Sequence, residues 1–215
     1  MTNQAIAQEI DNREGSGPVV PNSPLPEEQQ QRAAFYGLIA AMLRSAPDSE
    51  MLQRVAQLSE ITGPRDELSL SMSMLGLAAR SSSTEAVDDE FHDLFIGIGR
   101  GELMPYASWY LTGFLMEKPL GELRDHLVQL GFQRNPQVCE PEDHLAALCE
   151  VMAMLIQEDR SFEEVSLFFE AHLATWCDRF FDDLCNANGA VFYRNLGRFG
   201  AAFLSLESRY FSMQV

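Results

Sequence analysis

EPEDHLAALCEVMAMLIQ, residues 140–157, is the stretch that decides the fold, because a helix-start signal leads directly into an apolar stripe with helical spacing. Pro141 suits the first turn of a helix, and Glu142 and Asp143 complement the positive end of the helix dipole. The stripe consists of Leu145, Leu148, Met152, Leu155 and Ile156. This stretch predicts a helix that begins at Pro141 and buries one face against other helices.

Outside this stretch, the same helical periodicity continues in both directions. It predicts seven further helices, of which the sixth is long, over residues 27–43, 49–61, 68–79, 87–98, 120–130, 165–184 and 192–210. Ser82 with Glu85 and Ser161 with Glu164 are typical of capping boxes, and Gly131 is typical of a left-handed helix stop. Residues 103–110 fit a loop, a strand or a short helix. Because no alternating strand pattern is clear, the sequence predicts an all-α helical bundle of about eight or more helices.

Acidic residues dominate the charge of the chain. Thirty-two Asp and Glu against 15 Lys and Arg give a formal net charge of −17. Such a field repels phosphate backbones and anionic lipid headgroups over a Debye length of about 8–10 Å, so neither nucleic acid nor membrane insertion is expected. The same field either attracts a basic ligand, such as a peptide with arginines, or only confers solubility, and composition alone favours solubility.

The N-terminus has neither the basic nor the apolar region of a secretory signal. The longest apolar run, residues 33–43, is shorter than the roughly 18 residues that cross a bilayer. Four cysteines with no CxxC pair are too sparse for a disulfide scaffold. We therefore expect a cytoplasmic protein with reduced thiols.

No constellation of residues predicts catalysis or a bound cofactor. The glycine-rich residues 97–101 lack the spacing and the Lys-Ser/Thr of a phosphate loop, and we expect them to end a helix. Cys139, His144 and Cys149 follow at intervals of five, which a helix spreads about 140° apart, so no metal site is predicted. No histidine is paired in the sequence with a nucleophile, and no catalytic residue is predicted.

Residues 139–144 gather three carboxylates and an imidazole at the predicted start of a helix. One interpretation is helix capping alone, which explains Glu142 and Asp143 but does not require His144. The other is a hinge loop whose carboxylates bind a guanidinium group through charge-assisted hydrogen bonds. The residues themselves leave both interpretations open.

Several short motifs nevertheless occur in a fixed order. Residues 91–97 (FHDLFIG) and 105–110 (PYASWY) are similar to the F-x-x-L-F-x-G and P-Y-x-S-x-Y elements of the TorD/DmsD family of chaperones, which mature redox enzymes. Residues 140–145 (EPEDHL) resemble the E-P-x-D-H motif of that family, and residues 169–180 (FEAHLATWCDRF) resemble its penultimate-helix pattern. The resemblance covers residues 33–211.

This resemblance implies one TorD-like domain. Its parts would be a flexible segment at residues 1–26, an N-terminal helical portion at 27–131, a hinge loop and helix start at 132–144, and a C-terminal helical portion at 145–215. It implies a chaperone rather than an enzyme, without a cofactor or metal of its own. Such a chaperone binds the twin-arginine signal peptide or the apo form of a molybdopterin-containing oxidoreductase, and assists cofactor insertion before export. Both a monomer and a domain-swapped dimer fit the resemblance.

Carried over by position, two groups of residues would bind the client. An aromatic groove would take the apolar stretch of the signal peptide and include Tyr106, Ser108, Trp109 and Tyr110. The hinge and its acidic patch would attract the arginines and include Glu140, Pro141, Glu142, Asp143 and His144. Alanine at Asp143 or His144 is then expected to weaken client binding while leaving helical content and melting temperature nearly unchanged.

Two other functions stay open at this point. A helical adaptor would bind a folded partner without signal-peptide specificity, and its binding would ignore the twin arginines. A small hydrolase would use His144 with Asp143, and it predicts turnover of a small substrate and a perturbed pKa at His144.

Overall fold

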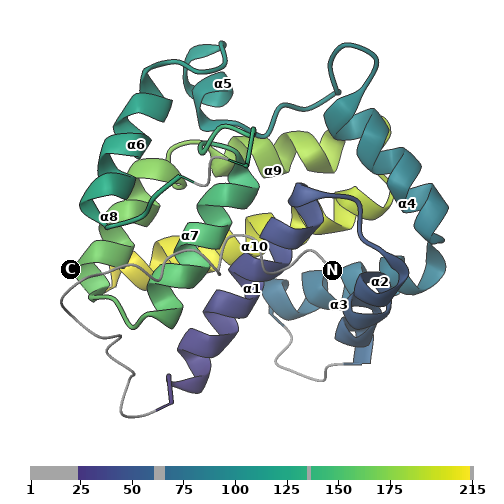
Figure 1. Cartoon of the computed structure of the whole chain (residues 1–215). Helices are drawn as coiled ribbons and strands as arrows, with labels where there is room; N and C mark the ends of the chain where they lie inside the picture. Colours follow the sequence, from purple (N-terminus) through teal and green to yellow (C-terminus); the bar gives the residue numbers. More distant parts are fainter. Residues whose placement is uncertain (1–23, 61–65, 135–136, 214–215) are drawn as a thin grey trace.

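Helices form the framework of the protein in this computed structural model, which describes residues 24–60, 66–134 and 137–213 (Figure 1). These ranges contain α1 (Glu27–Arg44), α2 (Ser49–Ala56), α3 (Glu67–Ser81), α4 (Thr84–Phe91), α5 (Ala107–Thr112), α6 (Lys118–Gln129), α7 (Leu145–Gln157), α8 (Phe162–His172), α9 (Cys177–Asn186) and α10 (Phe192–Ser212). A short 3-10 helix, η1 (Gln57–Glu60), extends α2, and a short π-helix, η2 (His92–Ile96), extends α4. The described residues contain no strand beyond an isolated antiparallel bridge, which confirms the all-α prediction. Of the segment predicted to be flexible, residues 1–23 lie outside the described part.

Two long-range helix pairs hold the bundle together. α1 packs along α7, and α3 packs along α10, which also contacts α9. Figure 1 shows α10 crossing the molecule, with α1 and α7 lying across it. Each pair joins a helix of residues 27–131 to a helix of residues 145–215. The core between them is rich in fully buried aromatic side chains, among them Tyr36, Phe168, Trp176, Tyr193 and Phe203.

A buried ion pair ties α1 to α10. Arg32 Nε and Nη2 donate to the two carboxylate oxygens of Glu207, each at 2.7 Å, and the Tyr36 hydroxyl donates to Glu207 Oε2 at 2.9 Å. The Arg32 guanidinium also lies 4.0 Å from the centre of the Tyr210 ring. This bidentate geometry compensates for the burial of both charges and fixes how α1 lies on α10.

The helix predicted to begin at Pro141 begins at Leu145 instead. Pro141 and the next two residues form a turn that is closed by a bond of 3.2 Å from His144 N to the Pro141 carbonyl. The residue that caps α7 is His144, whose Nδ1 accepts from Ala146 N at 3.0 Å. The prediction failed because a proline before a helix fits a first turn and a preceding turn equally well.

The long helix predicted over residues 165–184 is two helices, α8 and α9. The break follows His172, whose carbonyl accepts from the Trp176 indole nitrogen at 2.7 Å. Trp176 itself adopts a non-helical backbone, with φ −150° and ψ −23°, while its ring is buried. The tryptophan therefore turns the chain and fills the core at once.

Capping residues account for several of the other helix ends. The capping box of Ser161 and Glu164 is confirmed, and Gly131 has the predicted left-handed backbone, with φ +84°. Ser83, rather than Ser82, caps α4 by accepting from Ala86 N at 3.2 Å. Ser82 donates to the Ala78 carbonyl and so belongs to the end of α3.

Gly97 ends η2, as the glycine-rich pattern predicts. Its φ is +60°, and a Cβ atom there would lie 2.1 Å from the Arg100 carbonyl oxygen, so only glycine fits. None of the described helices combines the length and apolar character needed to cross a bilayer.

Candidate functional site

The two predicted groups of site residues meet at a short backbone bridge. Tyr106 pairs with His144 in an antiparallel bridge. On either side of it, Leu145 N donates to the Pro105 carbonyl at 2.8 Å, and Ala107 N donates to the Asp143 carbonyl at 3.0 Å. The segment that leads into α5 is therefore fixed to the segment that leads into α7.

Asp143 is fully buried and positions α5. Its Oδ2 accepts from Ser108 N at 2.9 Å, which satisfies a backbone N–H in the first turn of the helix. Ser108 is buried as well, and its Oγ accepts from Met116 N at 3.2 Å. Asp143 Oδ1 has no hydrogen-bond partner among the described residues. A continuous chain of contacts thus runs from Asp143 through Ser108 to the connection after α5.

His144 acts as a neutral cap. Burial, followed by the positive charge of Arg44, lowers the pKa of His144 to about 3. Its Nδ1 lone pair is occupied by Ala146 N, and its ring packs edge-on against Tyr106, with ring centres 5.0 Å apart. A general base works best with a pKa near the working pH, so this perturbation favours a structural role over a hydrolase.

The burial of Asp143 and His144 contradicts the expectation that alanine at either position would leave the fold nearly unchanged. Each side chain satisfies a backbone N–H that would otherwise lose its partner. Both side chains therefore accept from a backbone N–H of a helix, but not as the capping interpretation had it: Asp143 serves α5 rather than the helix that follows it, and His144 is the residue that caps α7.

The other two carboxylates of the hinge also have partners within the protein. Glu140 accepts a hydrogen bond from the Tyr106 hydroxyl, and burial followed by this contact raises the pKa of Tyr106. Glu142 forms ion pairs with Arg124 at 2.8 Å and Arg134 at 3.4 Å. Burial alone would raise the pKa of Glu142, but the hydrogen bond from Arg124 and the two positive charges outweigh it and lower the pKa.

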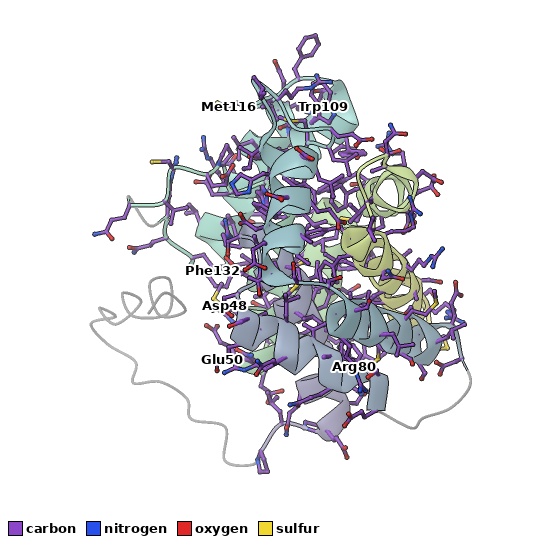
Figure 2. All side chains as sticks on the ribbon, turned by 90° about the vertical axis from the view of Figure 1, so that its right-hand side faces the viewer. Asp48, Glu50, Arg80, Trp109, Met116 and Phe132 are labelled. Atoms are coloured by element: carbon purple, nitrogen blue, oxygen red, sulfur yellow. The ribbon has the colours of Figure 1, made fainter. Side chains whose placement is uncertain are left out.

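The outward part of the site is apolar. Trp109 and Tyr110 are half-buried, whereas Leu111 near the end of α5 is exposed, as are Phe114, Leu115 and Met116 in the connection that follows the helix. Phe114 and Met116 are 68% and 71% exposed, well beyond what a packed core residue shows. Figure 2 shows Trp109 and Met116 at the same end of the molecule.

Two concavities flank α5. The first, which we call the apolar pocket, has a volume of about 350 Å³ and lies between α5, α6, α7 and α8, with walls that include Leu111, Leu123, Leu148 and Leu167. The second, which we call the aromatic–acidic pocket, has a volume of about 390 Å³ and is lined by Trp109, Tyr110, Gly113, Arg179, Asp182 and Asp183. The Tyr110 hydroxyl donates to Asp183 Oδ2 at 2.8 Å, and burial followed by this contact raises the pKa of Tyr110.

A histidine pair at the apolar pocket was missed by the sequence analysis. His126 Nδ1 and His172 Nε2 are 2.8 Å apart, so one imidazole donates its hydrogen to the other. Burial lowers the pKa of His126, and burial followed by the neighbouring His126 lowers the pKa of His172 to about 4. Both rings are therefore neutral at pH 7. The two residues lie 46 positions apart, and no local pattern joins them.

Side chains of the kinds that bind metal ions do not assemble into a metal site in the part of the chain described. No group of three or more His, Cys, Asp or Glu side chains is placed there to hold a metal ion. Cys149 is buried in α7, while Cys139 is exposed.

Comparisons with known proteins agree with one another. The model of the nitrate reductase delta subunit family matches residues 48–182. Chaperone protein TorD of Vibrio vulnificus (strain YJ016) is 32% identical over 133 residues, which are 56% of this chain and 62% of that protein. Chaperone protein TorD of Aliivibrio salmonicida (strain LFI1238) is 26% identical over 204 residues, which are 84% of this chain and 94% of that protein.

A solved structure shares the fold. The crystal structure of a chain proposed to be a redox enzyme maturation protein, from Archaeoglobus fulgidus, superposes with a TM-score of 0.54 at 18% identity. The superposition covers 91% of this chain and 99% of that chain, so the two proteins share their helical arrangement over the aligned part.

Proposed function

Because this chain belongs to the TorD-like nitrate reductase delta subunit family, we propose that it is a cytoplasmic chaperone for a molybdopterin-containing oxidoreductase. It binds the twin-arginine signal peptide, the apo form of the enzyme, or both, and holds the client back while the cofactor is inserted. No bond is made or broken by the chaperone. The relatives named TorD are chaperones, and this is the activity that we transfer.

The observation that carries the proposal is the exposed apolar connection after α5. Soluble proteins rarely expose a contiguous group of large apolar side chains unless it binds something. Here Phe114, Leu115 and Met116 are exposed in the connection, and Leu111 and Gly113, which precede them, line the two concavities. A groove with apolar walls suits a helical or extended peptide.

We assign different tasks to the two groups of site residues. Trp109 and Tyr110 contact the client, because they line a pocket. Five others position α5 and its connection for this contact through the bonds described above: Tyr106, Ser108, Glu140, Asp143 and His144. Pro141 and Glu142 hold the hinge turn, Glu142 through its two arginines.

The hinge itself is part of the proposal. Residues 132–144 join the two helical portions, whose contacts are the α1–α7 and α3–α10 pairs. If the hinge straightens, a second copy can supply the same contacts, which would give a domain-swapped dimer. Light scattering on the eluted peaks of a size-exclusion column distinguishes such a dimer from a monomer.

The decisive experiment is a calorimetric titration of the protein with a twin-arginine signal peptide from a molybdoenzyme encoded nearby. The same peptide with both arginines changed to glutamine is the control. Binding that weakens with the substitution supports the chaperone. Equal binding of both peptides favours an adaptor without signal-peptide specificity, and binding of neither removes the signal peptide from the proposal.

A salt series adds a second criterion. If the acidic surface draws in the arginines, affinity for the arginine peptide should fall as ionic strength rises from low to physiological values. The glutamine peptide should show a much flatter response. A flat response for both peptides would remove electrostatic attraction from the account.

A further inference from the structure

We propose that a peptide with two neighbouring arginines followed by an apolar stretch binds across α5, with its guanidinium groups in the aromatic–acidic pocket and its apolar side chains in the apolar pocket. This inference rests on the proposed function, and it moves the recognition of arginine from the hinge carboxylates to α9.

The first step concerns which carboxylates are available to a ligand. Asp143 is buried, and Glu142 already pairs with two arginines. Asp182 and Asp183 are exposed on α9, and among the described residues neither forms an ion pair. A guanidinium group can therefore reach α9 without first breaking an ion pair of either carboxylate.

The second step concerns the aromatic faces of the same pocket. The guanidinium carbon of Arg179 lies 6.0 Å from the Tyr110 ring centre, and that of Arg100 lies 4.9 Å from the Trp109 ring centre. These faces therefore suit a guanidinium group, but each is already covered by an arginine of the chain, which a ligand guanidinium would have to replace. Arg179 opposes an incoming positive charge, so we infer that the ligand displaces it. Removal of the Arg179 charge should then strengthen binding.

The third step concerns the apolar half. Residues 107 and 111 of α5 face the apolar pocket, while residues 109, 110 and 113 face the aromatic–acidic pocket. The connection between α5 and α6 exposes Phe114 and Met116. Met116 has a φ of +59°, a left-handed backbone that is uncommon for a side chain of this kind, and the Ser108 Oγ holds its N–H. The Met116 side chain is 71% exposed.

The distance across α5 sets a constraint on the ligand. A helix with its side chains is about 10 Å wide, and an extended peptide advances about 3.3 Å per residue. About three residues therefore connect one pocket to the other. Peptides in which the arginine pair lies close to the apolar stretch should therefore bind most tightly, because a longer flexible linker lowers the effective concentration of the second contact.

The charged half is tested with Asp182→Asn/Asp183→Asn. Its matched control is Asp88→Asn/Asp89→Asn, which removes the same charge from an exposed pair on α4. The probe is the synthetic peptide G-R-R-G-S-L-A-L-F-A-L-G, with a form that carries glutamine for both arginines. The α9 variant should lose about tenfold in affinity for the arginine peptide, the equivalent of one charge-assisted hydrogen bond, and little for the glutamine peptide. Arg179→Gln should raise affinity for the arginine peptide.

The apolar half is tested with Leu167→Glu in the apolar pocket. Leu77→Glu on α3 is the control, since both leucines are 55% exposed. Leu167→Glu should lower the affinity for the arginine peptide and for the glutamine peptide by a similar factor, and Leu77→Glu should lower neither affinity. A third peptide, with about eight Gly and Ser residues between the arginines and the apolar stretch, should bind less tightly than the original.

The outcomes separate this inference from the proposed function. Wild-type protein that binds none of the peptides contradicts the proposed function for signal peptides. Wild-type protein that prefers the arginine peptide, with an α9 variant that keeps this preference in full, overturns the inference alone. Equal losses in the α9 and α4 variants also overturn it, because they would report net charge rather than a site. Circular dichroism and urea unfolding confirm that each surface variant remains folded.

Discussion

Asp143→Ala should destabilise the protein by about 1–3 kcal/mol, which is the cost of leaving a buried N–H without its acceptor. The donor is Ser108 N, which lies 2.9 Å from Asp143 Oδ2 in an environment with no exposure of either residue. For a chain of this length, such a loss lowers the melting temperature by about 2–12 °C. Asp143→Asn keeps an oxygen acceptor in the same position. It should therefore lose about half as much, because the hydrogen bond is no longer charge-assisted.

The assay is thermal unfolding followed by circular dichroism, together with hydrogen exchange of residues 107–116. In Asp143→Ala, exchange should quicken at the amides of Ser108 and Met116, since Ser108 links Asp143 to Met116. If the melting temperature falls while exchange over residues 107–116 stays unchanged, Asp143 does not position α5. If both the alanine and asparagine variants melt like the wild type, the capping role is refuted altogether.

Three further predictions follow from buried groups and close packing. His144 is neutral in the fold, with a pKa of about 3 against 6.5 when unfolded, so stability present above pH 6.5 should be lost as the pH falls towards 3, by up to about 1.4 kcal/mol per pH unit. His144→Asn keeps a capping acceptor and should flatten a urea-unfolding profile between pH 7 and 5, whereas profiles parallel to wild type would contradict this. Glu207→Ala should lower the free energy of unfolding in urea by about 3–5 kcal/mol, because Arg32 stays buried without its partner. The double variant Arg32→Met/Glu207→Leu should recover most of this stability. A loss below about 1 kcal/mol in the single variant would speak against a buried charge. Gly76→Ala should destabilise the protein by about 1–3 kcal/mol, because the new Cβ would lie 2.3 Å from Ser59 N. Gly121→Ala has open space around it and should stabilise the protein by up to about 1 kcal/mol. Melting temperatures that shift in the same direction in both variants would contradict this prediction.

Local patterns predicted most helices because each amphipathic stripe is legible within a few turns. The α8–α9 break escaped them because Trp176 continues the apolar stripe by spacing. Its indole closes on the His172 carbonyl only once the surrounding core holds the ring in place. A side chain such as Trp176 fits the apolar stripe by its spacing and also hydrogen-bonds a carbonyl at a helix end. The sequence alone does not distinguish it from an ordinary core residue.

The sequence indicated which segments carry the candidate site residues, but not what their side chains contact. The motif at residues 140–145 includes Asp143, yet a carboxylate facing solvent and one capping a helix 35 residues earlier look the same in sequence. The proximity of Asp183 to Tyr110 depends on a contact across 73 residues, which no local pattern in the sequence indicates. Both gaps have one cause, which is that tertiary packing decides what each acidic side chain meets.

The pairing of Arg32 with Glu207 also bears on how the protein is made. The two residues are 175 positions apart, and chains are synthesised at about 5–20 residues per second, so Arg32 waits roughly 9–35 s for its partner. During that interval α1 lacks α10, and it also lacks α7 until residue 157 has been made. Closure of the bundle is thus a late event in the life of each new chain. A protein proposed to bind incompletely matured enzymes thus remains incompletely folded itself for much of its own synthesis.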